Sequence, residues 1–321
     1  MGSVGHVLAL AGGVGGAKLA HGLATVLPAG TLTVVVNTGD DFEHLGLAIS
    51  PDLDTVMYTL AGLADQERGW GLEDETWRFM GALERLGGPT WFRLGDRDLA
   101  THVLRTTLLA GGATLSSVTS ALCGRLGVAQ VVAPMSDQRV RTCVHTDAGI
   151  VSFQDYFVRM RCEPRVRAIH FAGAADARPS AALKSALDAS DLRAVVVCPS
   201  NPYLSIDPLL AIPGFPESLA SLRVPVIAVS PIVAGQAIKG PTAKIMRELG
   251  EQPSAVTVAR RYASWIDGFV LDRADAALAD TIRALRLAVH VTPTVMSSVA
   301  ERATLAEDVL AFAARMPRED R

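Results

Sequence analysis

The sequence predicts an α/β fold, with a Rossmann-like, mostly parallel open sheet as its core. Three observations support this class: short, continuously apolar runs recur along the chain, helix-length segments separate most of them, and a glycine-rich turn directly follows the first run. Strands without a polar face are typical of a parallel sheet that is buried on both faces. Strands that alternate with helices are joined by right-handed crossovers. Because 49% of the 321 residues are hydrophobic, a large buried core is expected.

The first fifty residues predict a strand, turn, helix and strand in that order. The apolar run at 6–10 precedes the glycine-rich turn at 12–16, the helix is expected at 17–27, and 32–36 is a fully apolar second strand. Later apolar runs predict further strands of the same sheet at 130–133, 167–171, 194–198, 224–229 and 268–271.

Two stretches interrupt this alternation. Residues 51–127 show several helix patterns and no convincing strand, so we expect a helical insertion in a single domain whose Rossmann-like core is 1–50 and 128–321. Residues 139–158 surround the turn residues Asp147 and Gly149 and predict a β-hairpin added to the sheet. A last helix at 304–316 is expected to pack into the core.

Composition excludes several classes of protein. With 30 Lys and Arg against 33 Asp and Glu and only 5% aromatic residues, the chain lacks the basic, aromatic surface that binds nucleic acid. No apolar run reaches the roughly 18 residues of a membrane span, and the first run meets glycines too soon for a signal peptide. We therefore expect a cytoplasmic protein without nucleic-acid or membrane partners. The four cysteines lack metal-site or disulfide spacing and are expected as free thiols.

The glycine-rich turn is the first candidate site. Gly12, Gly13, Gly15 and Gly16 follow a strand and open a helix that carries Lys18. Glycines allow backbone amides to approach a phosphate, and the helix N-terminus adds partial positive charge, so a diphosphate is the expected occupant. No hydroxyl residue follows the lysine, so this is not a Walker A loop. A tight turn between strand and helix is the alternative interpretation.

Acidic residues follow the second strand. Asn37, Asp40 and Asp41 stand where that strand ends, and ligands of open α/β sheets bind at the carboxyl ends of the strands. Two adjacent carboxylates beside a diphosphate suit Mg²⁺. The alternative is a solvated acidic turn. Further along, Asp52 and Asp54 lie in the first turn of an expected helix, where Asp commonly complements the helix dipole.

The segment 94–108 predicts a helix with two different faces. Asp96 is expected to cap it, and the residues spaced as a core stripe are Ala100, Val103, Leu104, Thr107 and Leu108. The opposite face carries Asp98, Thr101, His102 and Arg105, which fits a solvated face and a cleft lining equally well. Arg97, between two aspartates, would be oriented to bind a carbonyl or phosphate.

Polar residues also follow two later strands. Ser200 and Asn201 come after the run at 194–198, and Ser230 and Lys239 come after the run at 224–229. They would add hydrogen-bond donors and positive charge to the same rim, as a guanine edge or a phosphate requires. Turn chemistry is the alternative for Asn201 and the neighbouring prolines. Only four residues of the chain are lysines, and Lys18, Lys239 and Lys244 fall in two glycine-bearing segments of the rim.

Taken together, these segments resemble the 2-phospho-L-lactate transferase family of deazaflavin coenzyme F-420 biosynthesis. The resemblance runs in order from about residue 8 to 272, through GGVGGAKLAHGL, VVVNTGDDFEHLGLAISPDLDT, WGLEDETW, FRLGDRDLATH, APMSD, FQDYFV, PSNPYLSI, PVIAVSPIV and KGPTAK.

This resemblance implies an activity. Such enzymes transfer a phospho-three-carbon acid from its guanosine diphosphate derivative to the ribityl hydroxyl of the deazaflavin Fo, releasing GMP, with Mg²⁺. It implies nucleotide binding by the glycine loop, Asn37, Ser200, Asn201 and Ser230, and Fo binding by Asp54 and Arg97. Asp40 and Asp41 are our candidates for metal ligand or general base, and Asp54 is a further catalytic candidate. Trp70, Trp77, Trp91 or Met80 would form the wall beside the deazaflavin rings.

Two other functions stay open at this stage. A related family with a similar glycine loop binds nucleotide-sugars and acts in regulation without established catalysis. An NAD-dependent dehydrogenase would place an acid about 20 residues after the glycines, but no nicotinamide-site chemistry stands out. The sequence does not identify the three-carbon acid, which could be phospholactate, phosphoenolpyruvate or phosphoglycerate. It also leaves the oligomeric state open, although a homodimer is common among such folds.

Overall fold

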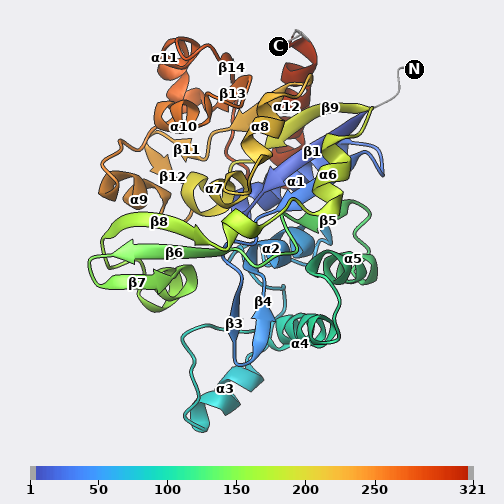
Figure 1. Ribbon diagram of the computed structural model, residues 1–321, viewed down its shortest axis with the longest axis vertical. Coiled ribbons are helices and arrows are strands. Elements are labelled where there is room, and N and C mark those ends of the chain that lie inside the picture. Colours follow the sequence, from blue (N-terminus) through green and yellow to red (C-terminus); the bar gives the residue numbers. More distant parts are fainter. Residues whose placement is uncertain (1–4, 317–321) are drawn as a thin grey trace.

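The computed structural model describes residues 5–316, and its centre is a seven-stranded sheet (Figure 1). All neighbouring strands of this sheet are parallel, which confirms the predicted Rossmann-like α/β class. The strand order is β14 (Ala288–Val291), β13 (Gly268–Leu271), β10 (Val226–Val229), β9 (Leu192–Val197), β1 (His6–Ala11), β2 (Leu32–Val36) and β5 (Val131–Pro134).

The apolar runs form these strands because both faces of the sheet are covered. In β1, Leu8 and Leu10 pack into one cluster of buried residues, while Val7, Ala9 and Ala11 pack into a second. The second cluster contains side chains of α1 (Gly13–Val26), α2 (Pro51–Leu60), α5 (Leu115–Arg125) and α12 (Val299–Arg315). The first contains side chains of α6 (Ala181–Leu187), α7 (Asp207–Leu210), α8 (Phe215–Ala220), α9 (Thr242–Glu248), α10 (Ala255–Tyr262) and α11 (Ala279–Arg283).

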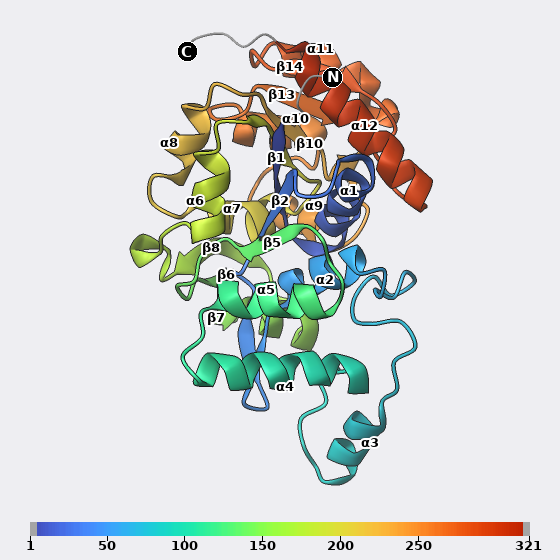
Figure 2. The same cartoon turned by 90° about the vertical axis from the view of Figure 1, so that its right-hand side faces the viewer.

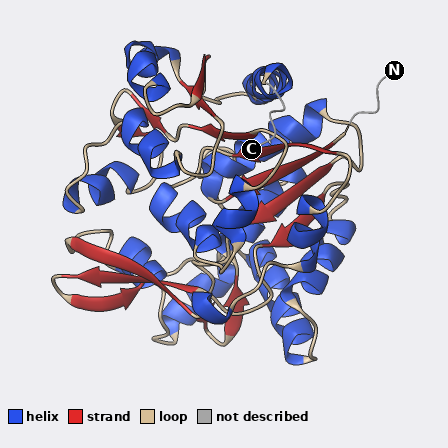
Figure 3. Cartoon of the chain, turned by 45° about the horizontal axis from the view of Figure 1, so that its top comes forward, coloured by secondary structure: helices blue, strands red, loops and turns tan. Residues whose placement is uncertain are grey.

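The predicted strand at 167–171 forms, but outside the central sheet. It is β8 (Val166–Ala172), and it pairs antiparallel with β6 (Arg141–Thr146), which also pairs with β7 (Gly149–Ser152). The predicted hairpin β6–β7 therefore belongs to a separate three-stranded sheet, seen beside the main sheet in Figure 3. The reason lies in β8 itself, where exposed Ala168, His170 and Ala172 alternate with half-buried Ile169 and Phe171. A strand whose side chains alternate in this way suits an antiparallel sheet that has one face exposed to solvent.

Several short elements were not predicted. Strand β14, at the edge of the sheet, is only half-buried, so its sequence gives a weak apolar signal. Two small hairpins, β3 (Phe42–His44) with β4 (Leu47–Ile49) and β11 (Ile232–Val233) with β12 (Gln236–Ala237), have strands of three and two residues. The remaining short helices are η1 (Asp155–Arg159), η2 (Ala174–Asp176), η3 (Pro202–Ile206) and η4 (Arg273–Leu278).

The segment between β4 and β5 is helical, as predicted. It contains α2, α3 (Arg78–Arg85), α4 (Asp96–Ala110) and α5, and its one strand-like pairing is an isolated bridge between Ala64 and Leu72. Helices α3 and α4 lie on the side of the molecule away from the central sheet (Figure 2). Among residues 5–316, no helix has the length and apolar character that crossing a membrane requires.

Candidate active site

A pocket of about 780 Å³ opens at the carboxyl ends of the central strands. Segments that follow β1, β2, β9, β10 and β14 line one part of it, and residues of the helical insertion and of the segment after β7 line most of the rest. This position follows from the parallel sheet, in which all strand ends of one kind meet at one edge. Of the predicted site residues, the pocket is lined by Gly12, Gly13, Gly15, Lys18, Asp40, Asp54, Ser200, Asn201, Ser230 and Lys239.

In the glycine loop, two of the amides already have partners within the protein. The amide of Gly12 donates to Ser200 Oγ at 3.1 Å, and the amide of Gly13, which starts α1 with φ +62°, donates to Asp52 Oδ1 at 2.7 Å. By helix geometry, the amides of Val14 and Gly15 in the same first turn have no intrahelical acceptor. The loop amides that can donate to a phosphate therefore begin at Val14, after Gly12 and Gly13.

Close packing is a second reason for these glycines. A Cβ at Gly15 would lie 2.3 Å from the Pro199 carbonyl oxygen, and one at Gly16 would lie 2.6 Å from Ser200 Oγ. Gly16 itself does not line the pocket. The loop thus presses directly against the segment after β9, so it needs glycine even before a ligand binds.

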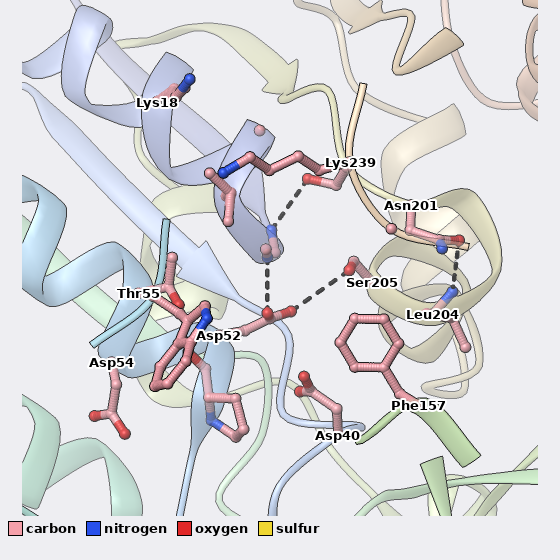
Figure 4. Close-up of a pocket in the computed structure, with 18 of the residues that line it drawn as sticks. Lys18, Asp40, Asp52, Asp54, Thr55, Phe157, Asn201, Leu204, Ser205 and Lys239 are labelled. Carbon is pink, nitrogen blue, oxygen red and sulfur yellow. Dashed lines mark hydrogen bonds between the residues drawn. The ribbon is translucent and has the colours of Figure 1, made fainter. Parts of the chain in front are cut away.

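Two carboxylates, Asp40 and Asp52, share one amide beneath the pocket. Asn37 Nδ2 donates to Asp40 Oδ1 at 3.1 Å and to Asp52 Oδ2 at 3.0 Å. Figure 4 shows Asp52 with Ser205, whose Oγ is 3.5 Å from Asp52 Oδ2. Asn37 is fully buried and does not line the pocket, so it positions the two carboxylates. Burial, together with the charges of Asp52 and Asp41, raises the pKa of Asp40 well above its usual range. Burial also raises the pKa of Asp52 to about 6.

Asp41, the predicted partner of Asp40, lies outside the pocket lining. Its Oδ2 accepts a hydrogen bond from Ser50 Oγ at 2.9 Å, and its Oδ1 is buried without a hydrogen-bond partner among the described residues. Burial raises the pKa of Asp41 to about 7, although the charge of Arg141 opposes this. The carboxylate that stands beside Asp40 at the pocket is Asp52, which the sequence suggested only as a helix-dipole residue.

Positive side chains gather across the pocket from these carboxylates (Figure 4). Lys18 Nζ donates to the Met296 carbonyl at 2.7 Å, and burial with the charges of Arg302 and Lys239 lowers its pKa. Lys239 is exposed and its Nζ is 3.4 Å from the carbonyl oxygen of Arg68. Lys244, by contrast, pairs with Glu248 and is absent from the pocket lining. Such a cluster of cations is suited to a polyanionic ligand.

The polar residues after β9 and β10 combine turn chemistry with a place in the pocket. Asn201 Oδ1 accepts from the amides of Tyr203 and Leu204, at 3.0 and 3.2 Å, and so caps η3. Ser230 Oγ donates to the Ile232 carbonyl at 2.8 Å. Both residues nevertheless line the pocket, so the two interpretations of these turns hold together.

Helix α4 buries its polar face, which corrects the expected core stripe. Asp98, His102 and Arg105 are buried, whereas Val103 is 48% exposed. This face packs against α2, where Arg105 Nη1 donates to Asp54 Oδ2 at 3.0 Å. Asp54, Asp98 and His102 line the pocket, so the face is part of its lining and is not solvated.

Arg97 does not reach the pocket. It is exposed, and its Nη1 donates to the carbonyl of Glu73 at 2.6 Å. Asp96 does not cap its own helix either, because its carboxylate accepts from the amides of α3 at Arg78 and Phe79. The carboxylate of Glu75 accepts from the amides of Arg97 and Asp98 in return. Each helix thus has its N-terminus capped from the other segment, across 17 to 23 residues, which a local sequence pattern does not reveal.

Arg93, four residues before Arg97, does line the pocket. Its guanidinium lies 4.1 Å from the ring centroid of Trp77. Of the wall residues named from sequence, Trp70 and Trp91 line the pocket, while Trp77 and Met80 do not. Phe92, Phe153 and Phe157 add further aromatic lining. This end of the pocket suits a flat aromatic ligand.

The donor set at Asp40 and Asp52 fits a divalent cation. The charge of Asp52 opposes the ionisation of Asp40, a bound cation would offset this repulsion, and hard cations prefer oxygen ligands. The sequence signal that could have identified Asp52 was weak, because an Asp in a first helical turn has an ordinary explanation. Its role depends on contacts with Gly13 and Asn37, which are 39 and 15 residues away.

Comparisons with known proteins identify the family of this chain. The family model described as 2-phospho-L-lactate transferase CofD matches residues 7–307. The chain is 41% identical over 314 residues to a phosphoenolpyruvate transferase of Streptomyces griseus, covering 96% of this chain and 98% of that protein. It is 37% identical over 306 residues to a 2-phospho-L-lactate transferase of Methanosarcina mazei, covering 95% and 99%.

Among solved structures, a UPF0052-family protein of Bacillus halodurans superposes with a TM-score of 0.62 at 16% identity, covering 95% of this chain and 98% of that one. This likeness supports the fold alone. The family model and the two relatives, each matched over nearly the whole chain, establish that this chain belongs to the 2-phospho-L-lactate transferase family.

Proposed function

We propose that this enzyme transfers a phospho-three-carbon-acid moiety from its guanosine diphosphate derivative to the ribityl hydroxyl of Fo and releases GMP. The family supports a transferase of coenzyme F-420 biosynthesis. The observation that supports the finer statement is one pocket with three parts: a cationic end with the glycine loop, a carboxylate pair at its centre, and an aromatic end with Asp54.

The cationic end would bind the diphosphate of the donor. Lys18 and Lys239 would neutralise phosphate charge, and the unpaired amides at the start of α1 would donate to its oxygens. Ser200, Asn201 and Ser230, on the same side, would meet the guanosine. Phosphoryl transfer needs mainly positioning and charge neutralisation, which these groups supply without a covalent intermediate.

Asp40 and Asp52 would hold Mg²⁺, with Asp52 taking the place that we first gave to Asp41. The ion would neutralise negative charge on the transferred phosphate and on the GMP leaving group. Asn37, which donates to both carboxylates, would keep them at a fixed separation. Asp41, below the lining, would act only through Ser50 and Arg141.

Asp54 would bind the acceptor hydroxyl at the aromatic end. The hydroxyl oxygen attacks the phosphorus that bears the three-carbon acid, a new P–O bond forms, and the bond to the oxygen of GMP breaks. A carboxylate near the hydroxyl accepts its proton. Arg93, together with the Trp70 and Trp91 side chains, would contact the deazaflavin rings, in the role first given to Arg97.

The test is incubation with Fo, Mg²⁺ and each guanosine-diphospho acid in turn, followed by mass analysis. The phosphoenolpyruvate derivative is the first donor to examine, because the Streptomyces griseus relative is named for it. We expect one new phosphodiester of Fo together with GMP. Binding of guanosine nucleotide without product from any donor would favour the regulatory, nucleotide-binding alternative. The cytoplasmic location and the homodimer stay predictions, and light scattering measures the second.

A further inference from the structure

Helices α2 and α4 face each other through side chains that are polar and buried. Asp54 and Tyr58 lie on α2, and Asp98, His102 and Arg105 lie on α4. His102 and Arg105 are each only 1% exposed. Arginine is almost never buried this deeply unless its charge has a partner. Burying polar and charged side chains costs more free energy than burying apolar ones of similar size, so the geometry of this interface calls for an explanation.

The contacts form a continuous chain. Arg105 donates to both oxygens of Asp54, from Nη1 at 3.0 Å and from Nη2. Its Nη1 is also 3.2 Å from His102 Nδ1. Since a guanidinium has donors only, His102 Nδ1 is the acceptor and the ring proton is assigned to Nε2.

Asp98 ends this chain. Its Oδ2 lies 3.2 Å from His102 Nε2, and its Oδ1 accepts from the Tyr58 hydroxyl at 2.7 Å. Burial opposes the charge of Asp98, yet the nearby His102 ring, the hydrogen bond from Tyr58 and the charge of Arg105 outweigh it and lower its pKa. Each member of the interface therefore has its orientation determined by a neighbour.

The cluster also has the composition of a metal site, but Arg105 argues against that use. One ligand atom each from Asp54, Asp98 and His102 lies within 4.8 Å of the others. The guanidinium, however, already contacts Asp54 and His102 and provides the positive charge that an ion would bring. The cluster is consequently a self-contained network of ion pair and hydrogen bonds.

Only part of the network reaches the pocket. Asp54, Tyr58, Asp98 and His102 line it, whereas Arg105 does not. A carboxylate oxygen can accept more than one hydrogen bond, so each oxygen of Asp54 keeps capacity for a ligand after it has paired with Arg105. The two-point pairing fixes the plane of the carboxylate and hence the direction of that capacity.

We propose that Arg105 is a positioning residue that orients Asp54 toward the hydroxyl of Fo, and that His102, which Asp98 contacts in turn, helps to hold Arg105 in place. This inference rests on the proposed function, in which Asp54 binds Fo. It adds that acceptor affinity depends on a residue that the acceptor does not touch.

Steady-state kinetics of Arg105→Met, Arg105→Lys and Asp54→Asn, and of the Arg105→Met/Asp54→Asn double variant, test the proposal. We expect Arg105→Met to raise the KM for Fo at least tenfold, with the KM for the donor within twofold of the parent value. Arg105→Lys, which keeps the charge but cannot hold both oxygens, should raise the KM for Fo at least threefold. The KM of the double variant for Fo should not exceed that of Asp54→Asn alone, because both changes remove the same interaction with the acceptor. Val103→Ala, on the exposed side of α4, is the control and should match the parent.

The outcomes separate two failures. If Asp54→Asn leaves the KM for Fo unchanged, the proposed role of Asp54 is wrong. Suppose instead that Asp54→Asn raises the KM for Fo, but Arg105→Met raises it further by the same factor in the double variant as alone. Arg105 then acts independently of Asp54 and the inference is overturned. The inference is also overturned if the Arg105 variants raise the KM for both substrates equally and lower the melting temperature, because Arg105 is then merely structural. Should Arg105→Met not fold, Arg105→Lys decides, and a KM for Fo within twofold of the parent refutes the inference.

Discussion

The glycine loop makes a prediction that separates packing from phosphate binding. In Gly15→Ala, the new methyl group would lie 2.3 Å from the Pro199 carbonyl oxygen and 3.5 Å from its carbonyl carbon. Gly15 lies in the first turn of α1, where alanine would otherwise be favoured over glycine by up to about 1 kcal/mol. Because the obstacle is backbone at the end of β9, relief requires the loop and the strand end to separate.

Overpacking of this kind costs about 3 kcal/mol, at the upper end of its usual range, since a backbone atom cannot rotate away. At roughly 2 °C per kcal/mol for a chain of this size, the melting temperature should fall by about 6 °C without any ligand. Differential scanning calorimetry of the ligand-free protein measures this. GDP affinity should fall as well, because the amide of Gly15 would move with the loop.

Gly124→Ala is the matched control. Gly124 lies near the end of α5, and a Cβ there would meet no atom within 4 Å. That variant should be unchanged or stabilised by about 0.5–1 kcal/mol. If Gly15→Ala also melted at or above the parent temperature and lost only GDP affinity, the glycine would serve phosphate approach alone and the packing argument would be refuted.

Three further predictions concern charged residues. Asp52→Asn should weaken binding of Mn²⁺, measured calorimetrically with GDP present, by at least tenfold, whereas binding within threefold of the parent would contradict the Asp40–Asp52 site. Lys239→Met should raise the KM for the donor about tenfold and leave that for Fo unchanged, as the loss of one charged partner of a phosphate predicts; equal effects on both substrates would argue against a donor role. The pKa of Asp98 is lowered in the folded state, so its stabilising contribution is present above the unfolded pKa and is lost as the pH falls through the folded pKa. Urea unfolding of Asp98→Asn should therefore show a smaller loss of stability between pH 7 and pH 3 than the parent, and identical losses would exclude this contribution.

Local sequence patterns predicted the parts of the fold that depend on near neighbours. The strands β1, β2 and β9 were recognised because all of their residues except His6 and Arg193 are buried, and the turn at Gly12 marked the start of α1. The same logic misplaced β8, whose side chains alternate between exposed and half-buried and which pairs antiparallel with β6.

The sequence predicted which loops form the site, but not which of their side chains face the pocket. Which aspartate faces the ligand depends on distant contacts, as for Asp52 with Gly13, and the side chain of Arg97 is directed elsewhere by Glu73. Helix α4 was misjudged for a similar reason. Its polar face is buried because α2 offers Asp54 and Tyr58 opposite, a fact that periodicity within α4 does not contain.

The division of the pocket lining along the chain affects how the enzyme can evolve. Most residues at the aromatic end come from one continuous stretch, from Ile49 to His102, whereas the cationic end is assembled from separate loops after β1, β9, β10 and β14. A single recombination event could therefore replace the acceptor-facing wall, while a new donor preference would need coordinated changes at several loops. Relatives that use different three-carbon acids should differ at individual loop positions, and chimaeras that exchange the stretch 49–102 should keep the donor preference of the recipient.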